Sequence, residues 1–112
     1  MDTTGLLSQR VKIVLRRFHI ETPREVIRGI ITDVDETGLR VSGRRFQEQA
    51  DLESGMPQEH PVELDTKVYW IPHGSIRYSE IIAPGSPSEK QDNEIQRRRV
   101  FTPQEAHRPT ES

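Results

Sequence analysis

Apolar positions recur with a short period along the first third of the chain. Across residues 11–16 they alternate with polar ones, which is typical of a half-buried strand. Residues 26–34 are rich in β-branched side chains that favour strands, and Gly29 among them predicts a bulge or a sharp bend. Residues 36–38 read as a turn, after which residues 39–42 alternate again as the returning arm of a hairpin.

Two further apolar runs follow a long polar stretch. Residues 68–71 predict a short strand that ends before Pro72, and residues 76–82 predict a last strand after a tight turn at 73–75. Five short strands without a helical period between them favour closure into a small barrel, because closure removes the edges of a lone sheet. The expected core consists of inward-pointing apolar residues: Val11, Ile13, Leu15, Ile30, Leu39, Val41, Val68, Ile76 and either Ile81 or Ile82.

The composition divides the chain into three parts. Only 31% of the 112 residues are apolar, which is too few for every segment to join a core. We expect a flexible N-terminus over residues 1–9, a barrel over 10–83, and a disordered tail over 84–112. Within the barrel, residues 47–65 contain Gly, Pro and many acids, and we expect an acidic loop there.

Charge is unevenly distributed although the net value is only −2. Residues 10–46 hold nine Lys or Arg against five acids, and residues 47–65 hold six acids and no Lys or Arg. The absence of Cys excludes disulfides and thiol catalysis. No apolar run reaches the ~18 residues of a membrane helix, and residues 1–10 lack the order of a signal peptide, so we expect a cytoplasmic protein without membrane contact.

The sequence offers little for catalysis. Asp33 and Asp35 would share one face of a strand, but two carboxylates alone do not form a metal or acid–base site. The four His residues lack the spacing of metal ligands, and no phosphate-binding or nucleophile motif is present. We therefore expect no enzyme, no catalytic residue, no cofactor and no metal.

The order of these segments resembles the Sm-like family of small barrels, which includes the LSm and Hfq-type proteins. The resemblance is carried by residues 11–15, 29–35 and 68–76, and the spacing from Gly29 to Asp35 matches the first Sm motif. It covers about residues 10–83 and implies an all-β fold, a five-stranded small SH3-like or Sm-like barrel with a disordered C-terminal tail. Where the family has Asn after the motif aspartate, Glu36 stands here, and residues 71–74 read Ile-Pro-His-Gly instead of the family's second motif.

The resemblance implies a homo-oligomeric ring that binds single-stranded RNA in post-transcriptional regulation. The site would lie where the turns at 35–38 and 73–75 meet, with further contacts from two arginines on the hairpin. The expected RNA-binding residues are Asp35, Arg40, His73, Arg77, Arg44 and Arg45. The alternative is a protein-interaction or scaffold module that binds no nucleic acid, in which the arginines pair with the acidic segment of their own chain.

Overall fold

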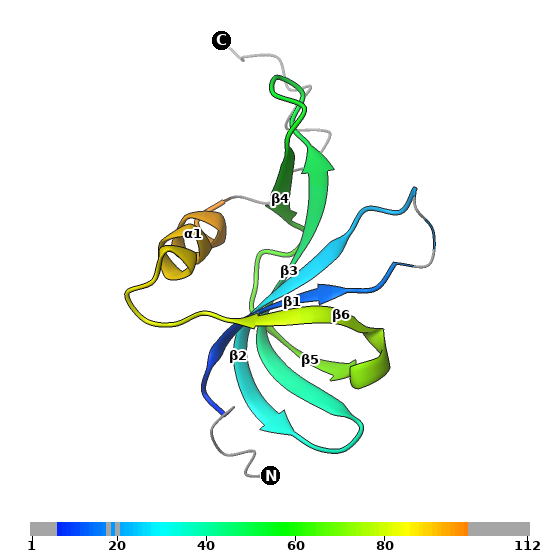
Figure 1. Cartoon of the computed structure of the whole chain (residues 1–112), viewed down its shortest axis with the longest axis vertical. Coiled ribbons are helices and arrows are strands. Elements are labelled where there is room, and N and C mark those ends of the chain that lie inside the picture. The colour runs from blue at the N-terminus through cyan, green and yellow to red at the C-terminus, as the bar shows by residue number, and fades with distance from the viewer. Residues whose placement is uncertain (1–6, 18, 20, 99–112) are drawn as a thin grey trace.

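One antiparallel sheet and one α-helix make up the part of the chain that the structure describes (Figure 1). The computed structural model describes residues 7–17, 19 and 21–98. The elements are β1 Arg10–Leu15, β2 Glu25–Val34, β3 Gly38–Ala50, β4 Pro57–Pro61, β5 Lys67–Pro72, the 3₁₀ turn η2 His73–Ser75, β6 Ile76–Ile81 and α1 Pro87–Gln96.

The sheet is open, with the strand order β4-β3-β2-β1-β6, and β5 pairs with the same edge of β3 as β4 does. The expected closed barrel of five strands is therefore wrong in its closure and in its number of strands. Closure would need a ladder between β5 and β6, but β5 pairs only with β3 and β6 only with β1 among the described residues. The sixth strand arises because β3 runs on to Ala50 and returns as β4.

Gly29 of β2 and Gly43 of β3 face each other in register. A Cβ atom on Gly29 would lie 2.2 Å from the carbonyl oxygen of Ser42, and one on Gly43 would lie 2.2 Å from that of Arg28. Only glycine allows two backbones to approach this closely. The irregularity of this strand pair lies between Ile31 and Asp33, beyond the position at which a bulge or bend was predicted; at Gly29 the structure shows the close approach of two backbones.

The main core lies on the inner face of the bent sheet, and a smaller one lies on the outer face. Val11, Ile13 and Leu39 are buried on the inner face, as expected. Ile30 and Val68 are exposed, so their placement in the core is wrong; of the two alternatives at the end of β6, Ile82 is buried and Ile81 is not. Ile30 and Val68 were misplaced because neighbouring residues of a strand point to opposite faces, and these two point to the outer face. The inner cluster consists of Val11, Ile13, Ile27, Ile31, Leu39, Val41 and Ile71.

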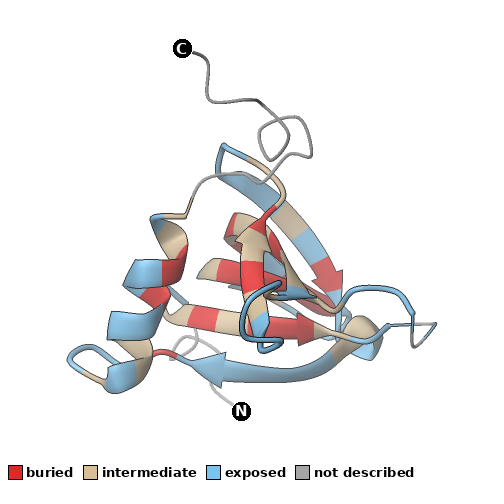
Figure 2. Cartoon of the chain, turned by 90° about the horizontal axis from the view of Figure 1, so that it is seen from above, coloured by how far each residue is buried: buried red, intermediate tan, exposed pale blue. Residues whose placement is uncertain are grey.

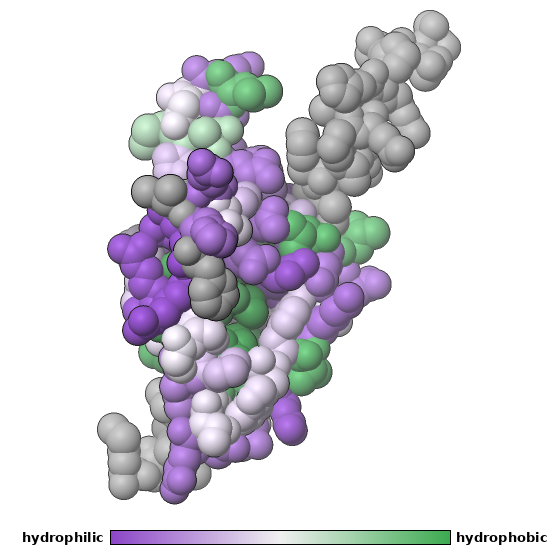
Figure 3. Space-filling model, turned by 90° about the vertical axis from the view of Figure 1, so that its right-hand side faces the viewer, coloured by the Kyte–Doolittle hydropathy of each residue, from purple (hydrophilic) through white to green (hydrophobic). Residues whose placement is uncertain are grey.

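The expected acidic loop over residues 47–65 is largely a hairpin. The end of β3 and β4 pair from Phe46 to Pro61 and form an arm, residues 46–61, that extends beyond the body of the sheet (Figure 1). The arm's turn is ordered by Asp51, whose carboxylate accepts hydrogen bonds from the backbone N and Oγ of Ser54. Leu52 at this turn is fully exposed, and Figure 3 shows hydrophobic side chains at the tip of the arm.

Part of the expected disordered tail is a helix. Ser86 caps α1 by accepting a hydrogen bond from the backbone N of Glu89, and Pro87 occupies its first turn. Figure 2 shows the buried positions of α1 on the side that faces the sheet. Ile95 packs there against Val14, Val26 and Phe46 in the outer cluster. The rest of the tail, residues 99–112, and residues 1–6 of the expected flexible N-terminus lie outside the described residues.

Candidate functional site

The turns at residues 35–38 and 73–75 meet, as the sequence analysis expected. The backbone N of His73 donates to the carbonyl oxygen of Thr37 at 3.0 Å, and His73 Nε2 lies 2.9 Å from the carbonyl oxygen of Asp35. Because that partner is a carbonyl oxygen, Nε2 is the donor in this contact. His73 therefore joins the hairpin of β2 and β3 to the β5–η2–β6 corner.

Asp35 organises its own turn. Its Oδ1 accepts hydrogen bonds from the hydroxyl and the backbone N of Thr37, and from the backbone N of Gly38 at 3.1 Å. The hydrogen bond from the Thr37 hydroxyl is the largest cause that holds the pKa of Asp35 below its ordinary value. Asp35 and His73, two of the residues expected to contact RNA at this junction, thus have structural partners within the chain.

The four arginines of the expected site do not form one cluster. Arg40 and Arg77 are exposed, and their side chains form no ion pair or hydrogen bond with any described residue; the backbone carbonyl of Arg40 accepts a hydrogen bond from the Thr32 hydroxyl. Arg44 donates from Nη1 to the carbonyl oxygen of Gln96 at 2.8 Å, and from Nε and Nη2 to that of Glu63. Arg44 therefore sits beside the C-terminal end of α1.

Arg45 points to the opposite face of β3 from Arg44, because the two residues are neighbours in one strand. It forms ion pairs with Glu25 at 3.3 Å and with Glu63 at 3.8 Å. Glu63 belongs to the acidic segment, so the alternative in which the arginines pair with their own chain is correct for Arg45. The same alternative is wrong for Arg44, because Arg44 donates hydrogen bonds to backbone carbonyl oxygens and not to carboxylates.

Tyr69 and Trp70 face opposite sides of β5. Tyr69 packs against the inner core and donates its hydroxyl to Glu63 Oε2 at 2.6 Å. Burial and this hydrogen bond raise the pKa of Tyr69 to about 12, and the same bond lowers the pKa of Glu63. Trp70 is 43% exposed on the outer face, directly across from Arg40 of β3. One aromatic residue thus belongs to the core and the other is presented to solvent.

β5 and β6 each leave one edge unpaired among the described residues. Every residue of β6 from Arg77 to Ile81 is exposed, and these include Tyr78 at 47% and Ile81 at 43%. Unpaired apolar edges are normally protected in proteins that remain monomeric. β4, by contrast, begins and ends with proline, and the carbonyl oxygen of Glu59 within it accepts a hydrogen bond from Arg98 Nη1. Among the described residues, β5 has proline only at its end, Pro72, and β6 contains none.

A cleft of about 300 Å³ opens on the inner face beside β6. Its walls are mostly aliphatic, and His73 and Ser79 are the polar residues that line it. Its walls come from β1, β2, β3, η2 and β6, so part of the inner core is open to solvent beside β6. The cleft is lined by Val11, Ile31, Val34, Leu39, His73, Ile76, Ser79 and Ile81.

A buried ion network fastens α1 and the arm to the sheet, and the sequence analysis missed it. Arg28 is 2% exposed; its Nε and Nη2 donate to the two carboxylate oxygens of Glu59 at 2.8 and 2.7 Å, and its Nη1 donates to Asp92 at 2.8 Å. Asp92 also binds Arg10, which reaches Glu89 at 3.3 Å. Burial alone would lower the pKa of Arg28, but its hydrogen bonds and charge interactions with Glu59 and Asp92 outweigh burial and raise it.

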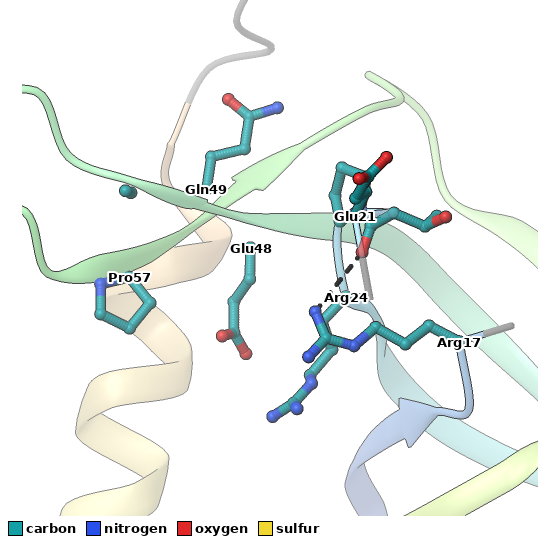
Figure 4. Close-up of a pocket in the computed structure, with 9 residues that line it drawn as sticks. Arg17, Glu21, Arg24, Glu48, Gln49 and Pro57 are labelled. Atoms are coloured by element: carbon teal, nitrogen blue, oxygen red, sulfur yellow. Dashed lines mark hydrogen bonds between the residues drawn. The ribbon is translucent and has the colours of Figure 1, made fainter. Parts of the chain in front are cut away.

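A cavity of about 450 Å³ lies between the arm and the segment that joins β1 to β2 (Figure 4). Arg17 and Arg24 line it together with Glu21 and Glu48. The hydrogen bond drawn in Figure 4 runs from Arg17 Nη1 to the carbonyl oxygen of Thr22 at 3.5 Å. Two cations and two carboxylates give this wide cavity no preference for a ligand of either charge.

Comparison with known proteins adds no relative to this picture. No family model, no curated protein and no solved structure matches the chain. Within the part of the chain that the structure describes, no helix is long and apolar enough to cross a membrane. The same residues contain no group of three or more His, Asp or Glu side chains placed to hold a metal ion. Function must therefore be argued from the edges and surfaces of the fold.

Proposed function

We propose that this protein is a non-catalytic interaction module that assembles with further copies of itself. The observation that carries the proposal is the pair of free edges at β5 and β6, which the open sheet leaves at the two sides of the η2 corner. β5 of one copy would pair with β6 of the next and satisfy the backbone groups of both edges. Such a contact joins different surfaces of the two copies, so it is head to tail.

The cleft beside β6 favours the same partner. A strand added to the β6 edge would extend the sheet over this opening and shield its aliphatic walls from water. Ile81 lines the cleft and is exposed at the edge, so pairing would bury it. In a closed barrel, no second copy would be needed to shield these aliphatic walls from water. The correction from a closed barrel to an open sheet therefore strengthens the expectation of a homo-oligomer.

Blocking one edge is expected to prevent assembly. The double variant Tyr78→Lys and Ile81→Lys blocks β6, and Val68→Lys with Trp70→Lys blocks β5; all four side chains are exposed, so the fold should persist. Light scattering should find each variant monomeric. An equimolar mixture of the two variants should form dimers and nothing larger. One variant keeps only its β5 edge and the other only its β6 edge, so each molecule can pair once.

A matched control uses the arm, which also exposes apolar side chains. Leu52→Lys with Met56→Lys changes two exposed residues that are distant from both edges and should leave the assembly intact. If the β5-blocked variant stayed dimeric on its own, two β6 edges would be pairing and the head-to-tail arrangement would be wrong.

Binding of single-stranded RNA is the second candidate function. It is favoured by Arg40 and Arg77, two exposed cations that no described carboxylate neutralises. In an electrophoretic shift assay, affinity for a ten-nucleotide oligouridylate should fall as salt rises, because each phosphate contact releases counterions. With two contacts, the slope of log K against log salt should be about −1.4. Affinity that does not respond to salt would exclude phosphate binding.

A further inference from the structure

The outer face of β3 and β5 carries two parallel rows of different chemistry. On β3, Arg40, Ser42 and Arg44 occupy alternate positions and therefore point to one side of the sheet. On β5, Trp70 lies directly across from Arg40, and Val68 lies across from Ser42. A row of cations and a hydroxyl thus runs beside a row that consists of one aromatic and one aliphatic residue.

The apolar row is open to solvent. Trp70 is 43% exposed and Val68 is 64% exposed, and Ile30 of β2, across from Ser42, is exposed as well. α1 covers a different part of the same face, where Ile95 packs against Val14, Val26 and Phe46. Pairing at the free edges of β5 and β6 would extend the sheet sideways and leave this face uncovered.

The cationic row has charge available for a ligand. The side chain of Arg40 has no ion-pair or hydrogen-bond partner among the described residues. Arg44 donates to carbonyl oxygens and lies over the Phe46 ring, so no carboxylate within ion-pair distance balances its charge. It lines a cavity of about 290 Å³ together with Ser42 and with Asp92, whose carboxylate is paired with Arg10 and Arg28. At a rise of 3.2–3.4 Å per residue, the Cα atoms of Arg40 and Arg44 are about 13 Å apart along β3.

We propose that these two rows form a platform for single-stranded RNA, with bases stacked on Trp70 and Val68 and phosphates held along Arg40 and Arg44. Stacking on an exposed aromatic side chain beside a positively charged track is the physical basis of single-strand recognition. The proposal rests on RNA binding, the second candidate function, and it places the RNA on the outer face. At the turn junction the Asp35 carboxylate carries the same charge sign as a phosphate, and His73 Nε2 is engaged within the chain. Arg44 is also engaged within the chain, but with carbonyl oxygens that leave its charge unbalanced.

Trp70 is the only tryptophan in the chain, so its fluorescence reports on the platform directly. Titration with the ten-nucleotide oligouridylate should quench the emission, and the quenching curve should give the same Kd as the anisotropy of a labelled RNA. Trp70→Leu keeps an apolar side chain but removes the stacking surface, and it should weaken binding by about tenfold or more.

Two charge variants separate the platform from the turn junction. Arg40→Gln should weaken binding and reduce the magnitude of the salt slope by about 0.7, the contribution of one phosphate contact to a single strand. Arg77→Gln tests the turn junction instead, because Arg77 is one of the residues expected there. Lys90→Gln is the matched control: it removes an exposed cation on α1 and should change neither Kd nor slope. Circular dichroism of each variant checks that the fold is retained.

The possible failures are distinguishable. RNA binding with unchanged tryptophan emission and unchanged affinity in Trp70→Leu would overturn the platform and leave RNA binding itself in place. Loss of affinity in Arg77→Gln but not in Arg40→Gln would overturn it in favour of the turn junction. No binding at 50 mM salt would overturn both the platform and the RNA candidate. If an acidic peptide quenched Trp70 and the RNA did not, the platform would be a peptide site and the proposal would be wrong.

Discussion

Replacement of Arg28 by leucine is expected to lower the free energy of unfolding by about 3–5 kcal/mol, the range seen when one partner of a buried ion pair is removed. The guanidinium is 2% exposed and holds both oxygens of the Glu59 carboxylate and one of Asp92. Without it, Glu59 loses its ion-pair partner in a buried setting, and Asp92 retains only Arg10. Urea denaturation followed by circular dichroism measures the change.

Two controls make this result specific to the network. Arg77→Leu removes an exposed arginine and should change stability by less than about 0.5 kcal/mol. Replacing Arg28, Glu59 and Asp92 together by leucine should recover much of the loss, because apolar side chains need no ion-pair partner. An Arg28→Leu variant as stable as the wild type would show that the buried ion pairs do not hold α1 and the arm in place.

Gly29→Ala is expected to cost at least about 3 kcal/mol, the upper part of the range for overpacking. The added methyl group would lie 2.2 Å from the carbonyl oxygen of Ser42 and 2.6 Å from the Cα of Gly43. Both neighbours are backbone atoms, so β2 and β3 must move apart at this point. The midpoint of thermal unfolding measures the loss.

Gly74→Ala is the matched control. A Cβ atom at Gly74 would have no heavy atom within 4 Å, so its stability should stay within about 0.5 kcal/mol of the wild type. Gly43→Ala should behave like Gly29→Ala, since its Cβ would lie 2.2 Å from the carbonyl oxygen of Arg28. Equal stability of the variants at positions 29 and 74 would contradict the close approach of β2 and β3.

Local patterns predicted most of the sheet because they depend on neighbouring residues. The alternation at residues 11–16, the β-branched run at 26–34 and the apolar run at 68–71 all correspond to strands. Alternation also fixes which residues share a face, but it does not fix which face is buried. Ile30 and Val68 were therefore placed in the core although they lie on the outer face.

The features that the sequence analysis missed depend on contacts between distant residues. Arg28 is 31 positions from Glu59 and 64 from Asp92, and no local pattern indicates either pairing. α1 places one apolar residue, Ile95, in the outer cluster, so its composition resembles that of a disordered tail. The available signal was Arg28 itself, a charged residue within a β-branched run, since a charge at such a position needs a partner.

The candidate site was predictable in part. The meeting of the turns at 35–38 and 73–75 was expected because the resemblance implies it, and the contacts of His73 confirm that the two turns meet. The separation of Arg44 from Arg45 follows from strand alternation. Their partners could not be predicted, because Gln96 and Glu25 come from other elements of the fold. The role of these residues in binding RNA stays a prediction.

The central claim is that the free edges of β5 and β6 pair between copies, and native mass spectrometry of the wild-type chain tests it most directly. At tens of micromolar protein and without added RNA, the spectrum should be dominated by multiples of the 12.9 kDa chain. The Tyr78→Lys and Ile81→Lys variant measured in parallel should appear as the monomer. A wild-type spectrum that contains only the monomer under the same conditions would contradict the account.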